Sequence, residues 1–162
     1  MLSGPPPLTD LVVDASILIE EGFRVRGRQL LQHRTLKLSV ATEAWSETQH
    51  ERRKRIVMLV ERGDLTPADA AQLADETAVI DAGLKIVPVL GYKQHLDEAA
   101  WRIPRDPRDV FTVALALSLN CGIWTNDRDF FGCGLPVWST EVLRRHLDET
   151  TRSAPHASDA ES

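Results

Sequence analysis

The sequence predicts an α/β fold in which a central, mainly parallel β-sheet is flanked by helices. Short apolar runs alternate with segments of helical periodicity, which is the pattern of successive β-α-β units. The five expected strands cover residues 11–14, 36–40, 84–88, 122–125 and a short stretch around 137–138. A segment of helical character follows each of the first four strands, and each such segment is long enough to carry the chain back to the start of a parallel neighbour.

Capping residues mark where two of the expected helices begin. Thr66 precedes Pro67, and Asp69 follows within the first turn, so a helix is expected to start at Pro67. Ser139, followed by Thr140 and Glu141, supplies a second start for a helix near the end of the chain.

The length of 162 residues fits one well-buried domain and is too short for two. We expect a flexible, proline-rich leader at residues 1–9, one domain at residues 10–149 and a disordered tail at residues 150–162. The net charge of −5 does not by itself suggest a nucleic-acid binder, because such domains usually carry a basic face.

The cysteines and the hydropathy pattern indicate a cytoplasmic protein. Cys121 and Cys133 are the only cysteines, which fits a reducing compartment better than a disulfide scaffold. The N-terminus lacks the basic and apolar regions of a signal peptide, and the most apolar stretch, residues 110–119, is too short to cross a bilayer.

Acidic residues stand where the predicted strands end, which is where open α/β sheets bind their ligands. Asp14 ends the apolar run Leu11-Val12-Val13, and Asp127 and Asp129 follow the strand 122–125. Asp109 opens an apolar, alanine-containing helix. Carboxylates gathered at one point repel each other unless a cation lies between them, so the pattern predicts a divalent-metal site acting on a group such as a phosphodiester.

Each acid also has a structural explanation. Asp14 could cap the following helix, Asp109 could stabilise the first turn of its helix through the macrodipole, and Asp127 could form a surface Asx turn. Asp106, three residues before Asp109, could be the true helix cap or a second acid.

A further acid is expected from the segment after the second strand. Glu43 and Glu47 lie four residues apart and share one face of the predicted helix. Glu51 and Arg55 continue the same spacing, so the two glutamates could equally belong to a solvated ladder of charges.

At these residues the chain resembles the PIN-domain nucleases, including the VapC-type toxin ribonucleases of bacterial toxin–antitoxin pairs. The stretch 12–18, with Asp14, looks like the first motif of the family, and 109–116 matches its acid followed by an alanine-rich helix. Residues 124–130 match its strand that ends in threonine and leads to two aspartates. The resemblance covers residues 11–147, although 52–93 is longer and more charged than in the smallest toxins.

The resemblance implies a PIN-like three-layer fold and an Mg²⁺- or Mn²⁺-dependent endoribonuclease. Asp14, Asp109 and Asp127 would hold the metal, with Asp106 as a further candidate acid. Glu47, and Asp129 with it, would orient or deprotonate the attacking water. Trp45-Ser46-Glu47 fits the family's helical glutamate better than Thr42-Glu43 does, and Thr125 would bond a phosphate oxygen or a ligating carboxylate.

The expected partners are an RNA substrate and, for a toxin, a second copy of the chain and a small antitoxin; no membrane is expected. The candidates for RNA contact are four arginines of basic segments: Arg52, Arg53, Arg55 and Arg108. The tryptophans are expected in the core, which leaves no aromatic platform for bases. The alternative function is a catalytically silent PIN-like module that binds RNA or protein. A dinucleotide site is disfavoured because no Gly-x-Gly-x-x-Gly follows the first strand.

Overall fold

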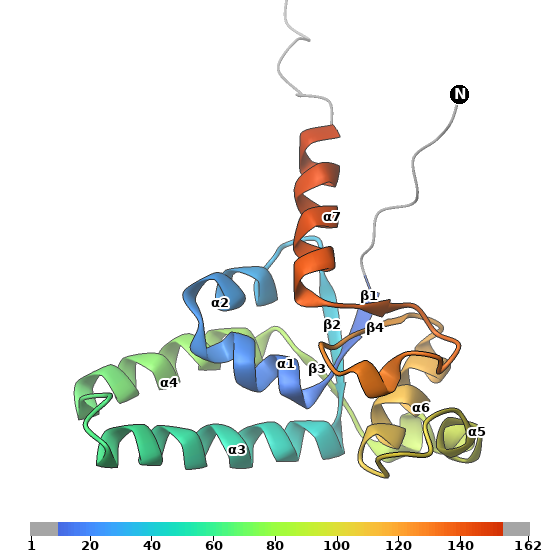
Figure 1. Cartoon of the computed structure of the whole chain (residues 1–162), viewed down its shortest axis with the longest axis horizontal. Helices are drawn as coiled ribbons and strands as arrows, with labels where there is room; N and C mark the ends of the chain where they lie inside the picture. Colours follow the sequence, from blue (N-terminus) through green and yellow to red (C-terminus); the bar gives the residue numbers. More distant parts are fainter. Residues whose placement is uncertain (1–9, 154–162) are drawn as a thin grey trace, which may run out of the picture.

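The computed structural model describes residues 10–153 and contains a five-stranded, fully parallel sheet in the order β3-β2-β1-β4-β5 (Figure 1). All five predicted strands are present, with slightly shifted ends. They are β1 (Asp10–Val13), β2 (Lys37–Ala41), β3 (Lys85–Val87), β4 (Gly122–Trp124) and β5 (Val137–Trp138). The carboxyl ends of β1 and β2 point down in Figure 1, and β4 pairs with β1 in parallel, so the residues that follow these three strands gather at one edge of the sheet.

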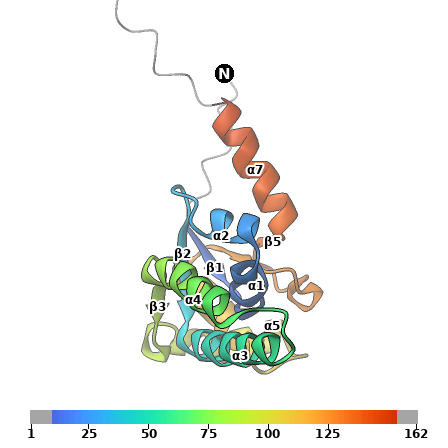
Figure 2. The ribbon, with the colours of Figure 1, turned by 90° about the vertical axis from the view of Figure 1, so that its left-hand side faces the viewer.

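Helices connect and cover the strands, and the predicted α/β architecture is confirmed. The α-helices are α1 (Ala15–Glu20), α2 (Val25–Leu31), α3 (Thr42–Glu61), α4 (Pro67–Ala82), α5 (Leu96–Arg102), α6 (Asp109–Leu119) and α7 (Thr140–Ser153). Short 3₁₀ turns are η1 (Glu21–Phe23), η2 (Val89–Gly91), η3 (Lys93–His95) and η4 (Arg128–Phe130). Figure 2 shows α7 projecting from one end of the body.

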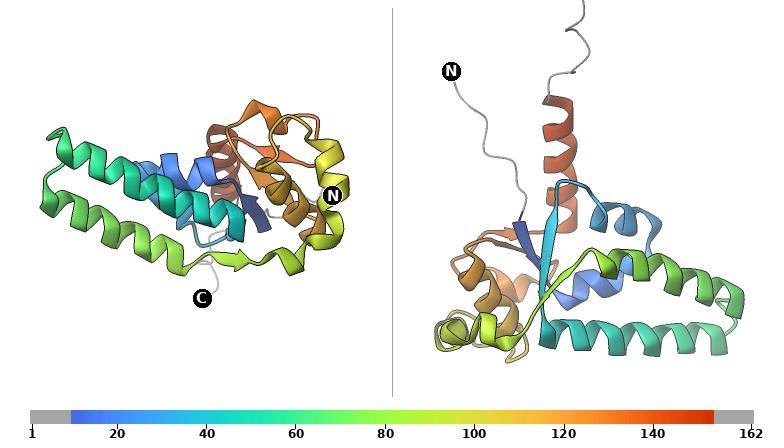
Figure 3. Two further views of the ribbon diagram at one scale, coloured as in Figure 1. Left: turned by 90° about the horizontal axis from the view of Figure 1, so that it is seen from below. Right: turned by 180° about the vertical axis from the view of Figure 1, so that it is seen from behind.

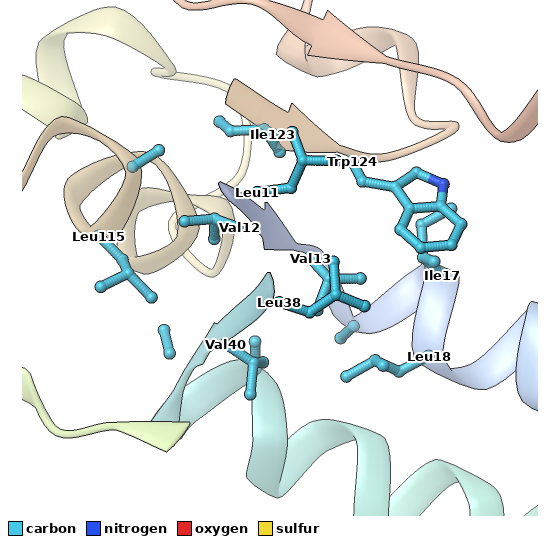
Figure 4. Packing of buried hydrophobic residues seen from close by; sticks show 14 of the residues in the cluster. Leu11, Val12, Val13, Ile17, Leu18, Leu38, Val40, Leu115, Ile123 and Trp124 are labelled. Atoms are coloured by element: carbon cyan, nitrogen blue, oxygen red, sulfur yellow. The ribbon is translucent and has the colours of Figure 1, made fainter. Parts of the chain in front are cut away.

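The central strands are buried on both faces, which explains why β1 reads as a continuous apolar run. Leu11, Val12 and Val13 are at most 1% exposed. In Figure 4, Leu115 of α6 lies on one side of the strands, and Leu18 of α1 lies on the other. Parallel strands covered on both sides have no solvent face and need no alternation of polar residues, so their hydrophobic sequence follows from the layered architecture.

Helices α3 and α4 form a long hairpin that extends away from the sheet (Figures 1 and 3). The predicted cap at the start of α4 is present, because Thr66 Oγ1 accepts a hydrogen bond of 3.1 Å from the amide of Asp69. Within the hairpin α3 packs against α4, and α3 also packs against α1.

Arg52 of α3 is a structural residue, which corrects its expected role as an RNA contact. Its side chain is buried and donates two hydrogen bonds to the carbonyl oxygen of Leu18, of 3.2 Å from Nε and 2.9 Å from Nη2. It also pairs with Asp81 of α4 at 2.7 Å. Arg52 thus ties α1, α3 and α4 together, and its guanidinium is engaged by Leu18 and Asp81.

The last helix corrects the expected boundary of the tail. Helix α7 continues to Ser153 instead of ending at 149, and the hydroxyls of Thr150 and Thr151 donate to the carbonyls of His146 and Leu147. The expected leader at 1–9 and the remainder of the tail at 154–162 lie outside the described residues. Between residues 10 and 153, no helix combines the length and the hydropathy needed to cross a membrane.

Candidate active site

Asp14 directly follows β1 and lies at the centre of the carboxyl edge of the sheet. It occupies the N-cap position of α1, yet its side chain makes no capping hydrogen bond. Its Oδ2 atom instead accepts hydrogen bonds from Ser16 Oγ at 2.6 Å and from Thr125 Oγ1 at 3.1 Å. Burial raises the pKa of Asp14, which is 7% exposed, while these two hydrogen bonds act against the rise.

Thr125 joins Asp14 to the loop that follows β4. Its hydroxyl donates to Asp14 and accepts from the amide of Asp127 at 3.0 Å. The Asp127 carboxylate in turn accepts from the amide of Asp129 at 2.9 Å, so the Asx-type turn and the site role are compatible. Of the two roles expected for Thr125, the structure shows the contact with a carboxylate.

Asp109 begins α6 and lines the same pocket as Asp14. Its Oδ2 atom is buried and has no hydrogen-bond partner among residues 10–153. Burial, together with the negative charges of Asp14 and Asp106, raises the pKa of Asp109 to about 7. A buried acceptor without a donor is rare in proteins and calls for an explanation such as an ion.

The two glutamates of α3 have different surroundings. Glu47 lines the same pocket as Asp14, and its carboxylate lies 3.6 Å from Nη1 of Arg108. Burial raises the pKa of Glu47, although Arg108 lowers it. Glu43 does not line the pocket and accepts a hydrogen bond from the hydroxyl of the buried Tyr92. The geometry therefore favours Glu47 as the helical acid.

The loop before α6 brings both an acid and a cation to the site. Asp106 accepts a hydrogen bond of 2.9 Å from the amide of Arg108, and the Arg108 guanidinium lies 3.5 Å from the same carboxylate. Arg108 itself is 73% exposed. Asp129 does not line the pocket and pairs with Arg105 at 3.3 Å.

A pocket of about 320 Å³, here called the acidic pocket, lies at this edge of the sheet. Its charged lining consists of seven carboxylates and two guanidinium groups: Asp14, Glu20, Glu47, Glu51, Asp106, Asp109, Asp127, Arg55 and Arg108. Arg53 is exposed but does not line it. Glu20 and Glu51 were not anticipated, and the only signal for Glu51 was its helical spacing from Glu47.

The donor set of the acidic pocket fits a hard divalent cation. Within residues 10–153, no three His, Cys, Asp or Glu side chains converge closely enough to surround one ion as they stand. Mg²⁺ keeps several of its waters, however, and needs only one or two protein carboxylates. Asp14 and the unsatisfied oxygen of Asp109 supply such a pair, and Asp127 lies close enough to raise the pKa of both.

Comparison with known proteins identifies the class to which this fold and site belong. The family model described as PIN domain matches residues 12–148, so the chain belongs to the PIN-domain family, whose members are generally nucleases. The chain is also similar to the crystal structure of PAE2754 from Pyrobaculum aerophilum, with a TM-score of 0.57 and 18% sequence identity. That match covers 87% of this chain and 96% of the other, and at this identity it supports the fold alone. No curated protein matches the chain.

Proposed function

We propose that this PIN-domain protein is an Mg²⁺- or Mn²⁺-dependent endoribonuclease that hydrolyses phosphodiester bonds in the acidic pocket. The observation that carries the proposal is the buried, unsatisfied Oδ2 of Asp109 among seven carboxylates that only two guanidinium groups balance. A phosphodiester is itself an anion, so it can enter such a pocket only together with cations.

Asp14 and Asp109 would hold the metal, with Asp127 acting directly or through water. Ser16 and Thr125 fix the orientation of the Asp14 carboxylate through Oδ2. The bound ion would polarise the scissile phosphate and make a coordinated water more acidic.

Glu47 would accept a proton from the attacking water at its carboxylate, since it lines the pocket from α3 and has a raised pKa suited to a general base. Arg55 and Arg108 also line the pocket, and both are exposed. They would contact non-bridging phosphate oxygens and hold the RNA backbone in place.

The test is cleavage of a labelled single-stranded RNA by the purified full chain with Mg²⁺ or Mn²⁺, beside an EDTA control. We expect Asp14→Asn to lower the rate by about 100-fold or more, since it removes a group that acts on the transition state. Glu43→Gln is the matched control, because it neutralises an acid outside the acidic pocket and should retain the rate within a few-fold. A single-stranded DNA of the same sequence tests whether the 2′-hydroxyl is required.

Persistent cleavage in EDTA, or an equal rate for Asp14→Asn, would overturn metal-dependent cleavage in the acidic pocket. No cleavage of any RNA, with Asp14→Asn leaving the affinity for divalent metal unchanged, would leave a non-catalytic binding module. A toxin role, with a small antitoxin and a homodimer as partners, is a narrower proposal that rests on the resemblance to toxin ribonucleases. A short open reading frame overlapping the start of the gene, together with growth arrest on expression of the wild type but not of Asp14→Asn, would support that role.

A further inference from the structure

A second pocket, of about 380 Å³, lies between the start of α2 and the start of α7 and is here called the arginine pocket. Figures 1 and 2 both show the first turn of α7 beside α2. The charged lining of the pocket consists of three arginines and two glutamates: Arg24, Arg26, Arg144, Glu21 and Glu141. The sign of its net charge is therefore opposite to that of the acidic pocket.

Both acids of the arginine pocket already have a cationic partner. Glu21, whose side chain is only 3% exposed, lies 3.5 Å from Nη1 of Arg24. Glu141 pairs at 3.3 Å with Arg145, which does not line the pocket. Because one guanidinium group balances each carboxylate, the charges of Arg26 and Arg144 are the excess positive charge of the cavity.

Arg26 and Arg144 make no ion pair with any residue between 10 and 153. Arg26 is exposed on α2, whereas Arg144 is half-buried one turn into α7. A half-buried cation loses part of its hydration, and this cost is offset only when an anion pairs with it. Two unpaired guanidinium groups that line one cavity also repel each other, so an anion bound between them relieves both costs.

Neutral hydrogen-bond donors complete the lining of the arginine pocket. Ser139 Oγ accepts a hydrogen bond of 3.3 Å from the amide of Val142, which leaves its hydroxyl proton to be donated elsewhere. Asn126 accepts from the amide of Thr140 at 2.9 Å and donates to the Thr140 hydroxyl at 3.2 Å, which fixes the loop after β4 against α7. Donors thus come from α2 and from the start of α7. A phosphate group, whose oxygens point in several directions, can accept from both, and it also matches the fork of a guanidinium group.

The arginine pocket adjoins the acidic pocket at two places along the chain. Glu20 lines the acidic pocket and Glu21 lines the arginine pocket. Asp127 and Asn126 are divided between the two pockets in the same way. Because consecutive Cα atoms are only about 3.8 Å apart, the two pockets lie side by side.

We propose that the arginine pocket is a second anion site, which binds one phosphate group through Arg26, Arg144 and the hydroxyl of Ser139. The site is separate from the carboxylates that would hold a metal, so it does not depend on the proposed ribonuclease activity. Two sources of the phosphate are chemically equivalent in the pocket. One is a phosphate of an RNA strand that continues into the acidic pocket, and the other is a free phosphate compound such as a nucleotide.

The first test is isothermal titration calorimetry of the full chain with inorganic phosphate, in EDTA and against NaCl of equal ionic strength. We expect Arg26→Gln and Arg144→Gln each to weaken phosphate binding by about 10-fold or more, since each removes a charge-assisted hydrogen bond. Arg144→Lys keeps the charge and should recover part of the affinity. Arg152→Gln is the matched control, because it removes the same charge from the last turn of α7, outside the pocket.

The second test distinguishes the two sources of the phosphate. Binding of a fluorescently labelled single-stranded RNA is measured without metal in the Asp14→Asn background, with and without Arg26→Gln and Arg144→Gln. Weaker RNA binding in these variants, together with competition by inorganic phosphate, would assign the pocket to a phosphate of the RNA strand. Unchanged RNA binding, together with phosphate binding that needs both arginines, would assign it to a free phosphate compound.

The inference is overturned if neither phosphate nor RNA binding depends on Arg26 and Arg144, which includes the case in which no phosphate binds. It is also overturned if Arg152→Gln weakens binding as much as the two pocket variants do. Thermal melts without phosphate verify that each variant is folded. Both binding tests require neither metal nor cleavage, so their failure leaves the ribonuclease proposal standing, and a failed cleavage assay leaves the phosphate site standing.

Discussion

Asp109 shows how a carboxylate of the candidate site can destabilise the fold that holds it. The pKa of Asp109 is raised to about 7 from an ordinary value of 3.8, so the folded state holds a proton that the unfolded chain releases. The contribution of this group to stability is therefore fully present below about pH 4 and is lost as the pH rises through about 7.

We accordingly predict that Asp109→Asn stabilises the metal-free protein at alkaline pH. Near pH 8 the variant should gain about 1–2 kcal/mol in unfolding free energy, a value discounted for the partial exposure of the side chain. Near pH 4 the gain should vanish, because the wild-type carboxyl is then neutral as well. Urea denaturation in EDTA at both pH values measures this, and a variant less stable than wild type near pH 8 would contradict it.

The two glutamates of α3 offer a second comparison at the scale of single residues. We expect Glu47→Gln to lower kcat by about 100-fold with little change in melting temperature, because the proposed role of Glu47 is to accept the proton of the attacking water and its side chain is 38% exposed. Glu43→Gln should retain kcat within a few-fold and lose about 1 kcal/mol of stability, since it weakens the bond from the buried Tyr92. Steady-state cleavage assays and thermal melts distinguish the two. The reverse pattern would make Glu43 the helical acid.

The positions of some candidate site residues were predictable from sequence and those of others were not, for reasons of local chemistry. The positions of Asp14 and Asp127 were predictable because each follows a buried strand, and residues that follow parallel strands lie at the carboxyl edge of the sheet. The buried Arg52 could not be distinguished from the exposed Arg53 by sequence. Within one turn of a charged helix, the sequence does not indicate which side chain bonds to a carbonyl of a neighbouring helix. Trp101 was expected in the core, and only the packing of α5 shows that its ring lies in solvent.

At the scale of elements, Arg52 sets how α3 lies against α1 and therefore how Glu47 faces Asp14. We predict that Arg52→Met destabilises the protein by about 2–4 kcal/mol, because it removes the donors to the carbonyl of Leu18 and the partner of Asp81. Arg53→Met is the matched control on the exposed side of the same helix and should change stability by no more than about 0.5 kcal/mol. Urea denaturation of both variants measures the difference; equal effects would show that Arg52 does not lock the helices.

The elements themselves were largely predictable, and the end of α7 is an exception with a local cause. All five strands follow from apolar runs, and α4 follows from its Thr66-Pro67 start. The end of α7 was missed because its last turn contains polar residues of weak helix propensity and no apolar periodicity. In that last turn the hydroxyl groups of Thr150 and Thr151 donate hydrogen bonds to backbone carbonyls of the preceding turn.

At the scale of the whole molecule, the fold alone does not specify a function, whereas the distribution of charge distinguishes one pocket. At 18% identity, the likeness to PAE2754 reflects a common backbone arrangement, which many functions can use. The overall charge of −5 is modest, yet seven carboxylates lie in one pocket. Repulsion among them is a property of the assembled molecule, because the acids come from four separate stretches of sequence.

A cation that binds this pocket should therefore stabilise the whole fold. We predict that Mg²⁺ or Mn²⁺ at about 100 times its dissociation constant adds about 2.7 kcal/mol to the unfolding free energy, which raises the melting temperature by several degrees in a chain of this size. The shift should be larger near pH 8 than near pH 5, because Asp109 must lose its proton before it can bind a metal. Thermal melts of wild type, Asp14→Asn and Glu43→Gln, each compared with NaCl of equal ionic strength, measure this. The stabilisation should be lost in Asp14→Asn and kept in Glu43→Gln. An equal shift in all three proteins, or the same shift with NaCl alone, would contradict metal binding in the pocket and indicate general screening of surface charge.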